Sequence, residues 1–318
     1  MIEAAKAYLA DDWQKFTSLL QSQLLSRVDI LNKINGYLTE RSGKQLRPLL
    51  CMLAARLCGG ECRENTIRFA TSCEMIHTAT LLHDDVADES PVRRGAPTVS
   101  AMVSPTASVL IGDYWLSRAV DLLTEGDDRE VIRYFSNCLN DLAEGEMIQI
   151  EKAAAMDTCY DDYIQIITRK TASLFMVSVM CGAHSVNCPP EPFEKLREYA
   201  RYLGLAFQMR DDILDYSPEL AIGKPVLQDV RERKITLPLL GAFENAGAAA
   251  RADIVARIEN GQYDGMLEFV RDNGGIEYAQ NILEEHTSKA IEALSPFAGC
   301  RAKEILSVLA DSLSFRKV

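Results

Sequence analysis

The sequence predicts an all-α fold, a large helical bundle, and three observations support this prediction. Apolar residues recur at intervals of three and four along most of the chain, which is the spacing of helices that pack on one face. Alternation of apolar and polar residues, which would indicate strands, is not convincing anywhere. Gly and Pro clusters interrupt the pattern at intervals typical of helices. We therefore expect one all-α domain over residues 1–318.

The helical spacing is clearest in two segments, residues 131–150 and residues 161–183. Expected breaks between helices are Gly59-Gly60, Pro91 to Pro97, Gly126-Asp127-Asp128, Pro189-Pro190, Ser217 to Pro225, Gly261 with Gly265, Gly274-Gly275, and Pro296. A chain of this length with 47% hydrophobic residues can bury a sizeable core. No repeat, low-complexity tract or linker divides it, so ten or more helices are expected in one domain.

Composition narrows the classes of partner and compartment. The net charge of −12 argues against nucleic-acid binding, which usually requires a basic surface. Nine cysteines without a Cys-x-x-Cys pair fit thiols in a reducing cytoplasm. The acidic, amphipathic start at residues 1–16 is unlike a signal peptide, and the apolar run at residues 173–183 is short for a membrane helix. We expect a cytoplasmic protein.

Two aspartate clusters share the pattern Asp-Asp-x-x-Asp, one within LLHDDVADESPVRRGAPT (81–98) and one within GLAFQMRDDILDY (204–216). The clusters consist of Asp84, Asp85 and Asp88, and of Asp211, Asp212 and Asp215. Positions four apart share a face of a helix, so the first and last aspartates of each cluster should point together. If the clusters face each other across a bundle, they form a strongly negative slot.

Such a slot should hold a divalent cation. Oxygen-only ligands suit a hard ion, and Mg²⁺ typically binds one or two carboxylates and completes its shell with water and substrate phosphate. One such cluster alone would as readily be a solvated helix end. Two copies, each ending an apolar helix and each followed by a basic loop, favour a metal site. A di-iron bundle would need two Glu-x-x-His pairs, and only Glu74 with His77 fits.

Basic residues accompany both clusters. They are Lys44, Arg47, His77, Arg93, Arg94, Lys170, Lys224 and Lys234. Lys44 and Arg47 immediately precede an apolar helix. His77 should share one helical stripe with Asp84 and Asp88. Arginine donates paired hydrogen bonds to phosphate and lysine supplies a point charge. Singly, each is typical of a surface charge or a core histidine, but together with the acids they predict an Mg²⁺-dependent site for diphosphates.

Several segments carry these motifs in a fixed order along nearly the whole chain. They are GKQLRP, EMIHTATLLHDDVADESPVRRGAPT, VLIGDYW, EGEMIQ, RKTASLF, GLAFQMRDDILDY, GKPVLQDVRERKITLPLL and, more weakly, VRDNGGIEYAQNILEEHTSKAIEAL. In order and spacing they resemble the trans-type isoprenyl diphosphate synthases. The resemblance implies an all-helical fold around a central cavity, usually a homodimer, that condenses isopentenyl diphosphate with an allylic diphosphate and uses Mg²⁺.

The resemblance also implies roles for individual residues. The ligands of the Mg²⁺ cluster match Asp84, Asp88, Asp211 and Asp215. The residues that bind the allylic diphosphate match Arg93, Lys170 and Lys234, with Lys224 nearby. The isopentenyl diphosphate site matches Lys44, Arg47, His77 and Arg94. Polar groups lining the reacting carbon match Thr171 and Gln208. Leu227 and Arg233 depart from the family, which usually has glycine at both positions, and both lie in a loop at 217–236 that should close over the site and exclude water.

The helix before the first cluster should set product length. In this family an aromatic residue four or five positions before the first aspartate marks a short product, and here those positions are Thr80 and Ala79. The floor is therefore open, and Met75 and Ile76 lie one turn deeper. One turn rises about 5.4 Å, similar to one isoprene unit, which favours a product of about C30 or longer. Such octaprenyl- or solanesyl-type products serve as quinone side chains.

Other functions stay open. A farnesyl or geranylgeranyl diphosphate synthase would differ only in product length. A class I terpene cyclase would need Asn/Asp-x-x-Ser/Thr-x-x-x-Glu as its second motif, and the intact Asp211 and Asp215 argue against it. A catalytic subunit of a heteromeric synthase would need a partner chain, and a structural helical protein would leave both clusters unexplained. We favour a homodimer with at most transient membrane contact for product release.

Overall fold

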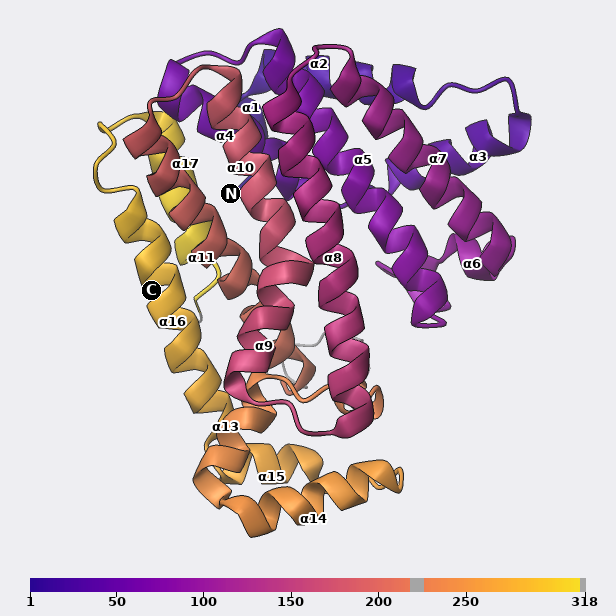
Figure 1. The fold of residues 1–318 in the computed structure, drawn as a ribbon, viewed down its shortest axis with the longest axis vertical. Coiled ribbons are helices and arrows are strands. Elements are labelled where there is room, and N and C mark those ends of the chain that lie inside the picture. The colour runs from indigo at the N-terminus through magenta and orange to yellow at the C-terminus, as the bar shows by residue number, and fades with distance from the viewer. Residues whose placement is uncertain (218–225, 315–318) are drawn as a thin grey trace. The chain divides into compact units, whose positions relative to one another are not determined.

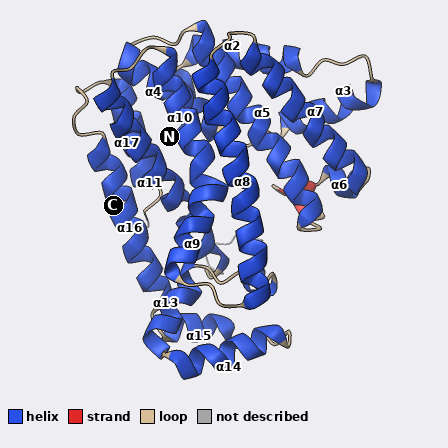
Figure 2. Cartoon of the chain, in the orientation of Figure 1, coloured by secondary structure: helices blue, strands red, loops and turns tan. Residues whose placement is uncertain are grey.

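The structure is a computed structural model and describes residues 1–217 and 226–314. Helices make up nearly all the regular structure in these ranges, so the predicted all-α class is confirmed (Figure 1). The strands among the described residues are β1 (Val92–Arg93) and β2 (Ala96–Pro97), which pair antiparallel and are drawn red in Figure 2. The sequence analysis missed this hairpin because two-residue strands leave no alternating pattern.

The chain divides into two compact units. Unit 1 consists of Met1–Ser136, Val177–Leu196 and Phe297–Ile305, and unit 2 of Asn137–Met176, Arg197–Pro296 and Leu306–Val318. Unit 1 contains α1 (Ile2–Tyr8), α2 (Ala10–Gln23), α3 (Asp29–Glu40), α4 (Leu46–Gly59), α5 (Glu64–Ala87), α6 (Val99–Met102) and α7 (Pro105–Thr124). Unit 2 contains α9 (Tyr160–Ile167), the π-helical turn η1 (Thr168–Ala172), α12 (Gln228–Arg231), α13 (Leu237–Ala246), α14 (Ala248–Glu259), α15 (Met266–Asp272) and α16 (Gly275–Ala293). The helices shared by the units are α8 (Arg129–Ala155), α10 (Ser173–Ser185), α11 (Pro190–Asp215) and α17 (Arg301–Asp311).

Most of the predicted turns fall between these helices. Gly126-Asp127-Asp128 separates α7 from α8, and Gly274 immediately precedes α16. Pro190 is the first residue of α11, where a missing N–H costs no hydrogen bond. The predicted break at Ser217 to Pro225 lies mostly outside the described residues. The prediction of one domain over the whole chain stays a prediction.

Helix α5 is the centre of unit 1. Its buried residues include almost every position from Thr66 to Ile76, so all of its faces are covered, and it packs against α2, α4 and α7. Two buried polar side chains nearby are paired, since the Trp115 indole donates to Asn35 (2.9 Å) and Asn35 donates to the Leu24 carbonyl (2.8 Å). A helix covered on every side is held rigidly, and its C-terminal end carries the first aspartate cluster.

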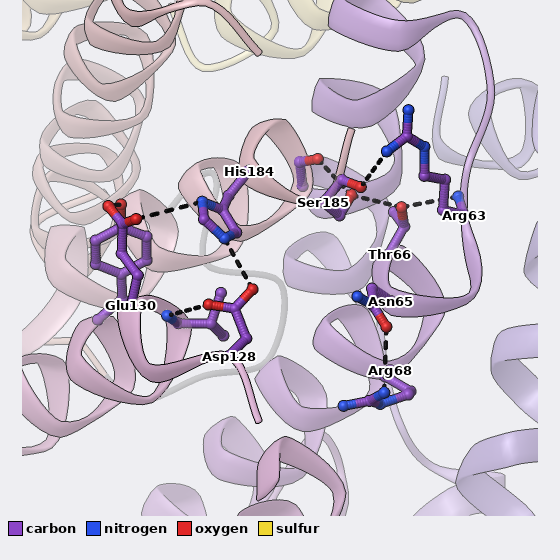
Figure 3. Close-up of polar contacts among 11 residues, drawn as sticks. Arg63, Asn65, Thr66, Arg68, Asp128, Glu130, His184 and Ser185 are labelled. Atoms are coloured by element: carbon purple, nitrogen blue, oxygen red, sulfur yellow. Dashed lines mark hydrogen bonds and ion pairs between the residues drawn. The ribbon is translucent and has the colours of Figure 1, made fainter. Parts of the chain in front are cut away.

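A second group of buried and partly buried polar contacts in unit 1 lies near the N-terminal end of α5 (Figure 3). The Thr66 and Ser185 hydroxyls are 2.6 Å apart, and His184 lies 2.8 Å from the carboxylate of Asp128. These contacts connect α5, the end of α10 and the start of α8. None of their residues was predicted as a site residue, and their role in the fold is to anchor helix ends.

The π-helical turn η1 packs closely against two glycines of unit 2. A Cβ added at Gly145 of α8 would lie 2.8 Å from the Cβ of Arg169, and one added at Gly204 of α11 would lie 2.6 Å from the Cα of Ala172. Only glycine therefore allows the two helices to approach this closely. The helix predicted over 161–183 is confirmed, but its π turn was not predicted. Such turns are frequent at functional sites.

One continuous helical run, Tyr160–Ser185, is long and apolar enough to cross a membrane by length and composition. It is longer than the apolar stretch at 173–183 on which the sequence analysis relied. Its most apolar window is 67% buried inside the protein, which is typical of a core helix. The predicted cytoplasmic location stays a prediction.

Candidate active site

The first aspartate cluster lies at the C-terminal end of α5. Asp85 is 4% exposed, and its carboxylate accepts a hydrogen bond from the Arg93 guanidinium (2.5 Å). Burial raises the pKa of Asp85, and the Arg93 charge opposes that rise. Asp84 is half-buried and Asp88 is exposed, so the outer aspartates remain accessible. Asp88 is one residue past the helix, yet its N–H still donates to the Asp84 carbonyl (2.8 Å).

The hairpin after this cluster positions two arginines. Its turn is formed by Arg94 (φ 53°) and Gly95 (φ 74°), and two left-handed residues suit a tight antiparallel turn. Arg93 lies on β1 and bonds Asp85. Arg94 donates to the Arg41 carbonyl (2.9 Å), and its guanidinium lies so close to Gly43 that a Cβ there would be 2.5 Å from it.

The predicted isopentenyl diphosphate residues all lie in unit 1. Lys44 is exposed before α4, as predicted. Arg47 was predicted to precede the helix as well, but it is the second residue of α4, because the helix starts at Leu46. Burial lowers the pKa of His77 well below its usual range, and the charges of Arg47, Arg94 and Arg93 lower it further. The His77 imidazole is therefore neutral near pH 7, and three arginine charges act on it.

A buried carboxyl lies one turn before His77. Glu74 is 2% exposed, and its Oε2 has no hydrogen-bond partner. Burial raises its pKa to about 7, against the opposing charges of Arg47 and Arg94. The sequence analysis considered Glu74 only as half of an iron motif and missed this position beside the arginines.

The predicted chain-length residues lie on α5. Met75 is completely buried and Ala79 is 1% exposed, whereas Thr80 is partly buried and donates to the His77 carbonyl (2.8 Å). Their role as a floor for the growing product stays a prediction.

The second aspartate cluster ends α11 in unit 2. Asp212 is 4% exposed and accepts hydrogen bonds from the Tyr163 hydroxyl (2.6 Å) and the Gln208 amide (2.8 Å). Burial raises its pKa to about 7. Asp211 is exposed. The Asp215 carboxylate accepts from the backbone N–H groups of Gln228 (3.0 Å) and Asp229 (3.1 Å).

Lys170 and Thr171 project from the π turn. Lys170 pairs with Glu146 and donates to Gln149 (3.2 Å), both on α8. Thr171 donates to Gln208 (2.7 Å). Lys170 is partly buried, and a lysine charge partly withdrawn from water needs such partners, so α8 holds the ammonium group in place.

Lys234 follows α12 and pairs with Glu232 (2.5 Å). Nearby Asp229 is partly buried, and burial together with the charges of Asp212 and Asp215 raises its pKa well above the usual range. Lys224 lies outside the described residues, as does the part of the predicted closing loop from 218 to 225. Leu227 and Arg233, where the family usually has glycine, are both left-handed, with φ of 60° and 59°.

Several of the side chains described for unit 2 line one cavity of about 130 Å³. Its lining includes four predicted site residues, Lys170, Thr171, Gln208 and Lys234. It also includes polar residues that the sequence analysis did not assign to the site, Gln149, Lys152, Tyr163, Asp212, Asp229 and Thr236. Asp212 stood in the second aspartate motif, and Gln149, Asp229 and Thr236 stood in the quoted segments EGEMIQ and GKPVLQDVRERKITLPLL, whereas Lys152 and Tyr163 lie outside the quoted segments. Cationic, carboxylate and hydroxyl groups around one small cavity can hold a phosphorylated ligand.

The outer aspartates fit Mg²⁺ better than a metal held by protein alone. Within residues 1–217 and 226–314, no group of three or more His, Cys, Asp or Glu residues could hold a metal ion. Mg²⁺ needs no such cage, because it keeps several waters and uses one or two carboxylates with substrate phosphate. Accessible carboxylates at Asp84 and Asp88 in unit 1, and at Asp211 in unit 2, each meet that requirement.

Comparison with known proteins extends this picture. The family model for polyprenyl synthetase matches residues 28–268. The octaprenyl diphosphate synthase of Escherichia coli (strain K12) is 36% identical over 314 residues, which cover 97% of each chain.

Two crystal structures share the fold over almost the whole chain. A decaprenyl diphosphate synthase from Rhodobacter capsulatus has a TM-score of 0.93 at 35% identity and covers 98% of both chains. A polyprenyl synthase from Caulobacter crescentus CB15, complexed with calcium and isoprenyl diphosphate, has a TM-score of 0.92 at 31% identity and covers 100% of this chain and 98% of that one. The resemblance predicted from the motifs is confirmed. A polyprenyl synthetase is a prenyltransferase, so the predicted enzyme class is confirmed too. This chain belongs to the polyprenyl synthetase family.

Proposed function

We propose that this enzyme condenses isopentenyl diphosphate with farnesyl or geranylgeranyl diphosphate to make a long-chain, all-trans polyprenyl diphosphate. The cavity of unit 2 carries the proposal, because Lys170 and Lys234, from separate segments, line it together with Asp212. Its relatives named as octaprenyl and decaprenyl synthases support the long product.

The proposed chemistry begins when the allylic diphosphate ionises. Fixed charges at Lys170 and Lys234 stabilise the negative charge that develops on the leaving diphosphate. Mg²⁺, for which the proposed ligands are Asp84, Asp88, Asp211 and Asp215, would supply Lewis-acid stabilisation of the same oxygens. The isopentenyl double bond then attacks the allylic carbon, and the departing diphosphate takes the proton lost beside the new cation. By the resemblance, Arg93 and Lys224 also bind the allylic diphosphate.

Binding of isopentenyl diphosphate is proposed for unit 1. Arg47 and Arg94 carry the charge for its diphosphate, with Lys44 exposed beside them. His77 is neutral near pH 7 because of burial and the arginine charges, so it acts as a hydrogen-bonding group and not as a cation. This division gives the two diphosphates different sets of charges.

Product analysis tests the proposal. The purified chain alone receives Mg²⁺, isopentenyl diphosphate and farnesyl diphosphate, and the dephosphorylated products are identified by mass spectrometry. A ladder ending at one long prenol is expected. A stop at C20 would assign the short-chain alternative. No extension would contradict a self-sufficient enzyme and favour the heteromeric alternative, which a partner chain would then rescue.

An Ala79→Phe variant tests the open floor directly. A bulky ring at this buried position on α5 should block the growing tail, so the product should shorten by at least one isoprene unit. Ala79→Ser, which changes the volume little, is the control and should keep the product of the unmodified chain. An unchanged product in Ala79→Phe would mean that the tail does not pass this turn.

The remaining assignments follow from the family resemblance. We propose a cytoplasmic homodimer that hands its product to the membrane by transient contact, for use as a quinone side chain. Light scattering at several protein concentrations tests the dimer, and a concentration-independent monomer would contradict it.

A further inference from the structure

Three hydrogen bonds form one continuous network along the wall of the unit 2 cavity. The Tyr163 hydroxyl donates to Asp212 (2.6 Å), the Gln208 amide donates to Asp212 (2.8 Å), and the Thr171 hydroxyl donates to Gln208 (2.7 Å). All four residues line the cavity, and they come from α9, η1 and α11. This hydrogen-bond network therefore connects the buried Tyr163 with the Thr171 hydroxyl at the cavity wall.

The direction of each bond follows from the chemistry of its partners. A carboxylate only accepts, so Asp212 forces Gln208 to present its NH₂ group to it. The carbonyl oxygen of Gln208 must then face Thr171, which donates its one hydroxyl proton there.

The consequence is a fixed polarity at Thr171. Its proton is directed to Gln208, so the oxygen lone pairs are what it can present to the cavity. If the Gln208 carboxamide were turned over, its NH₂ would donate to Thr171 and the hydroxyl proton would be released towards the ligand. An oxygen lone pair stabilises positive charge on a neighbouring carbon, whereas a hydroxyl proton opposes it.

We infer that Tyr163 and Asp212 are positioning residues that hold the Gln208 carboxamide in one orientation and thereby direct the Thr171 oxygen at the carbon that becomes cationic. This inference rests on the proposed function, which places Thr171 and Gln208 beside the reacting carbon. The second aspartate of the cluster has a different task from the outer two: it orients neutral side chains and does not bind metal.

The structure offers a matched control for the tyrosine. Tyr199 is also buried in unit 2, on α11, and its hydroxyl donates to the Leu306 carbonyl (2.8 Å). It does not line the cavity. Tyr163→Phe and Tyr199→Phe therefore each remove one buried hydroxyl and one hydrogen bond, and the loss of folding stability should be similar.

The test compares single-turnover elongation in the full-length chain with both substrates saturating. Tyr163→Phe should lower the rate about tenfold, which is the effect of removing a residue that hydrogen-bonds to a ligand at metal sites. It should leave KM for isopentenyl diphosphate within about twofold. Tyr199→Phe should keep the rate of the unmodified chain. Equal rates in the two variants would overturn the inference.

A double-mutant cycle shows whether Tyr163 acts through Thr171. Thr171→Val keeps the shape of the side chain and removes the hydroxyl whose direction matters. In that background Tyr163→Phe should have almost no further effect on the rate, because there is no oxygen left to orient. The same tenfold loss in both backgrounds would overturn the inference while the proposed function stands. An unmodified chain that makes no product, either alone or with a partner chain, would overturn both.

Discussion

The two aspartate clusters have the same sequence pattern but different surroundings. In each, the middle aspartate, Asp85 or Asp212, is only 4% exposed, and at least one outer aspartate is exposed. Asp85 in unit 1 accepts from a cation, Arg93. Asp212 in unit 2 accepts from two neutral groups, on Tyr163 and Gln208.

This difference shows in the protonation of the two carboxyls. Burial raises the pKa of both, but only Asp85 has a guanidinium in its hydrogen bond to oppose the rise. The pKa of Asp212 reaches about 7. Neighbouring positions on a helix face different directions, so one motif supplies outward ligands and an inward anchor. Asp85 therefore positions a cation, Arg93, whereas Asp212 positions the neutral side chain of Gln208.

The largest effect is expected at the outer aspartates. Asp84→Ala or Asp211→Ala should lower turnover roughly a hundredfold or more, because metal-supported stabilisation of the leaving diphosphate is lost. Steady-state kinetics with Mg²⁺ measures it, and Asp253→Ala, an exposed aspartate on α14, is the control. Near-normal turnover in both cluster variants would contradict the proposed site.

A smaller and more discriminating effect is expected at the middle aspartates. Asp85→Asn weakens the contact that holds Arg93, so KM for the allylic diphosphate should rise about tenfold, the low end for a hydrogen bond to a charged group. Asp212→Asn affects the orientation of neutral groups near the reacting carbon, so it should lower kcat more than it raises KM. The same change in both variants would mean that the two anchors do not differ.

The sequence predicted the charged site residues that stand in motifs. It did not predict contacts between residues that lie far apart in the chain. Charged residues that interrupt apolar helices are conspicuous, so Asp84, Asp211 and Lys170 could be predicted. Tyr163 looks like any core tyrosine, and its partner Asp212 is 49 residues away, so no local pattern reveals the bond. The π turn was missed for a similar reason, because it depends on two glycines, Gly145 and Gly204, that contact it from other helices.

Glu74 extends the comparison to pH. Burial raises its pKa from 4.5 to about 7. Between those values the folded chain holds a proton that the unfolded chain has lost, so the free energy of unfolding should fall as pH rises. A shift of about 2.5 units corresponds to roughly 3 kcal/mol.

Glu74→Gln should remove this contribution, because glutamine is neutral at every pH. Urea unfolding between about pH 5 and 8 should show a flatter dependence in the variant than in the unmodified chain. Asp212 contributes equally in both proteins and cancels from the difference. Identical pH dependence in the two proteins would show that Glu74 does not titrate there.

The smallest effects are expected at the two left-handed residues after the second cluster. A left-handed residue other than glycine costs roughly 1–2 kcal/mol, so glycine relieves strain at either position. Arg233 is exposed, and Arg233→Gly should stabilise the fold by less than about 1 kcal/mol once the greater freedom of the unfolded chain is subtracted.

Leu227 is 6% exposed, and its N–H donates to the Asp215 carbonyl (2.9 Å). Leu227→Gly should therefore destabilise by about 2 kcal/mol, because the lost burial exceeds the relieved strain. Urea midpoints at one pH decide between these signs, and destabilisation by Arg233→Gly would mean that its side chain contributes more than its backbone costs.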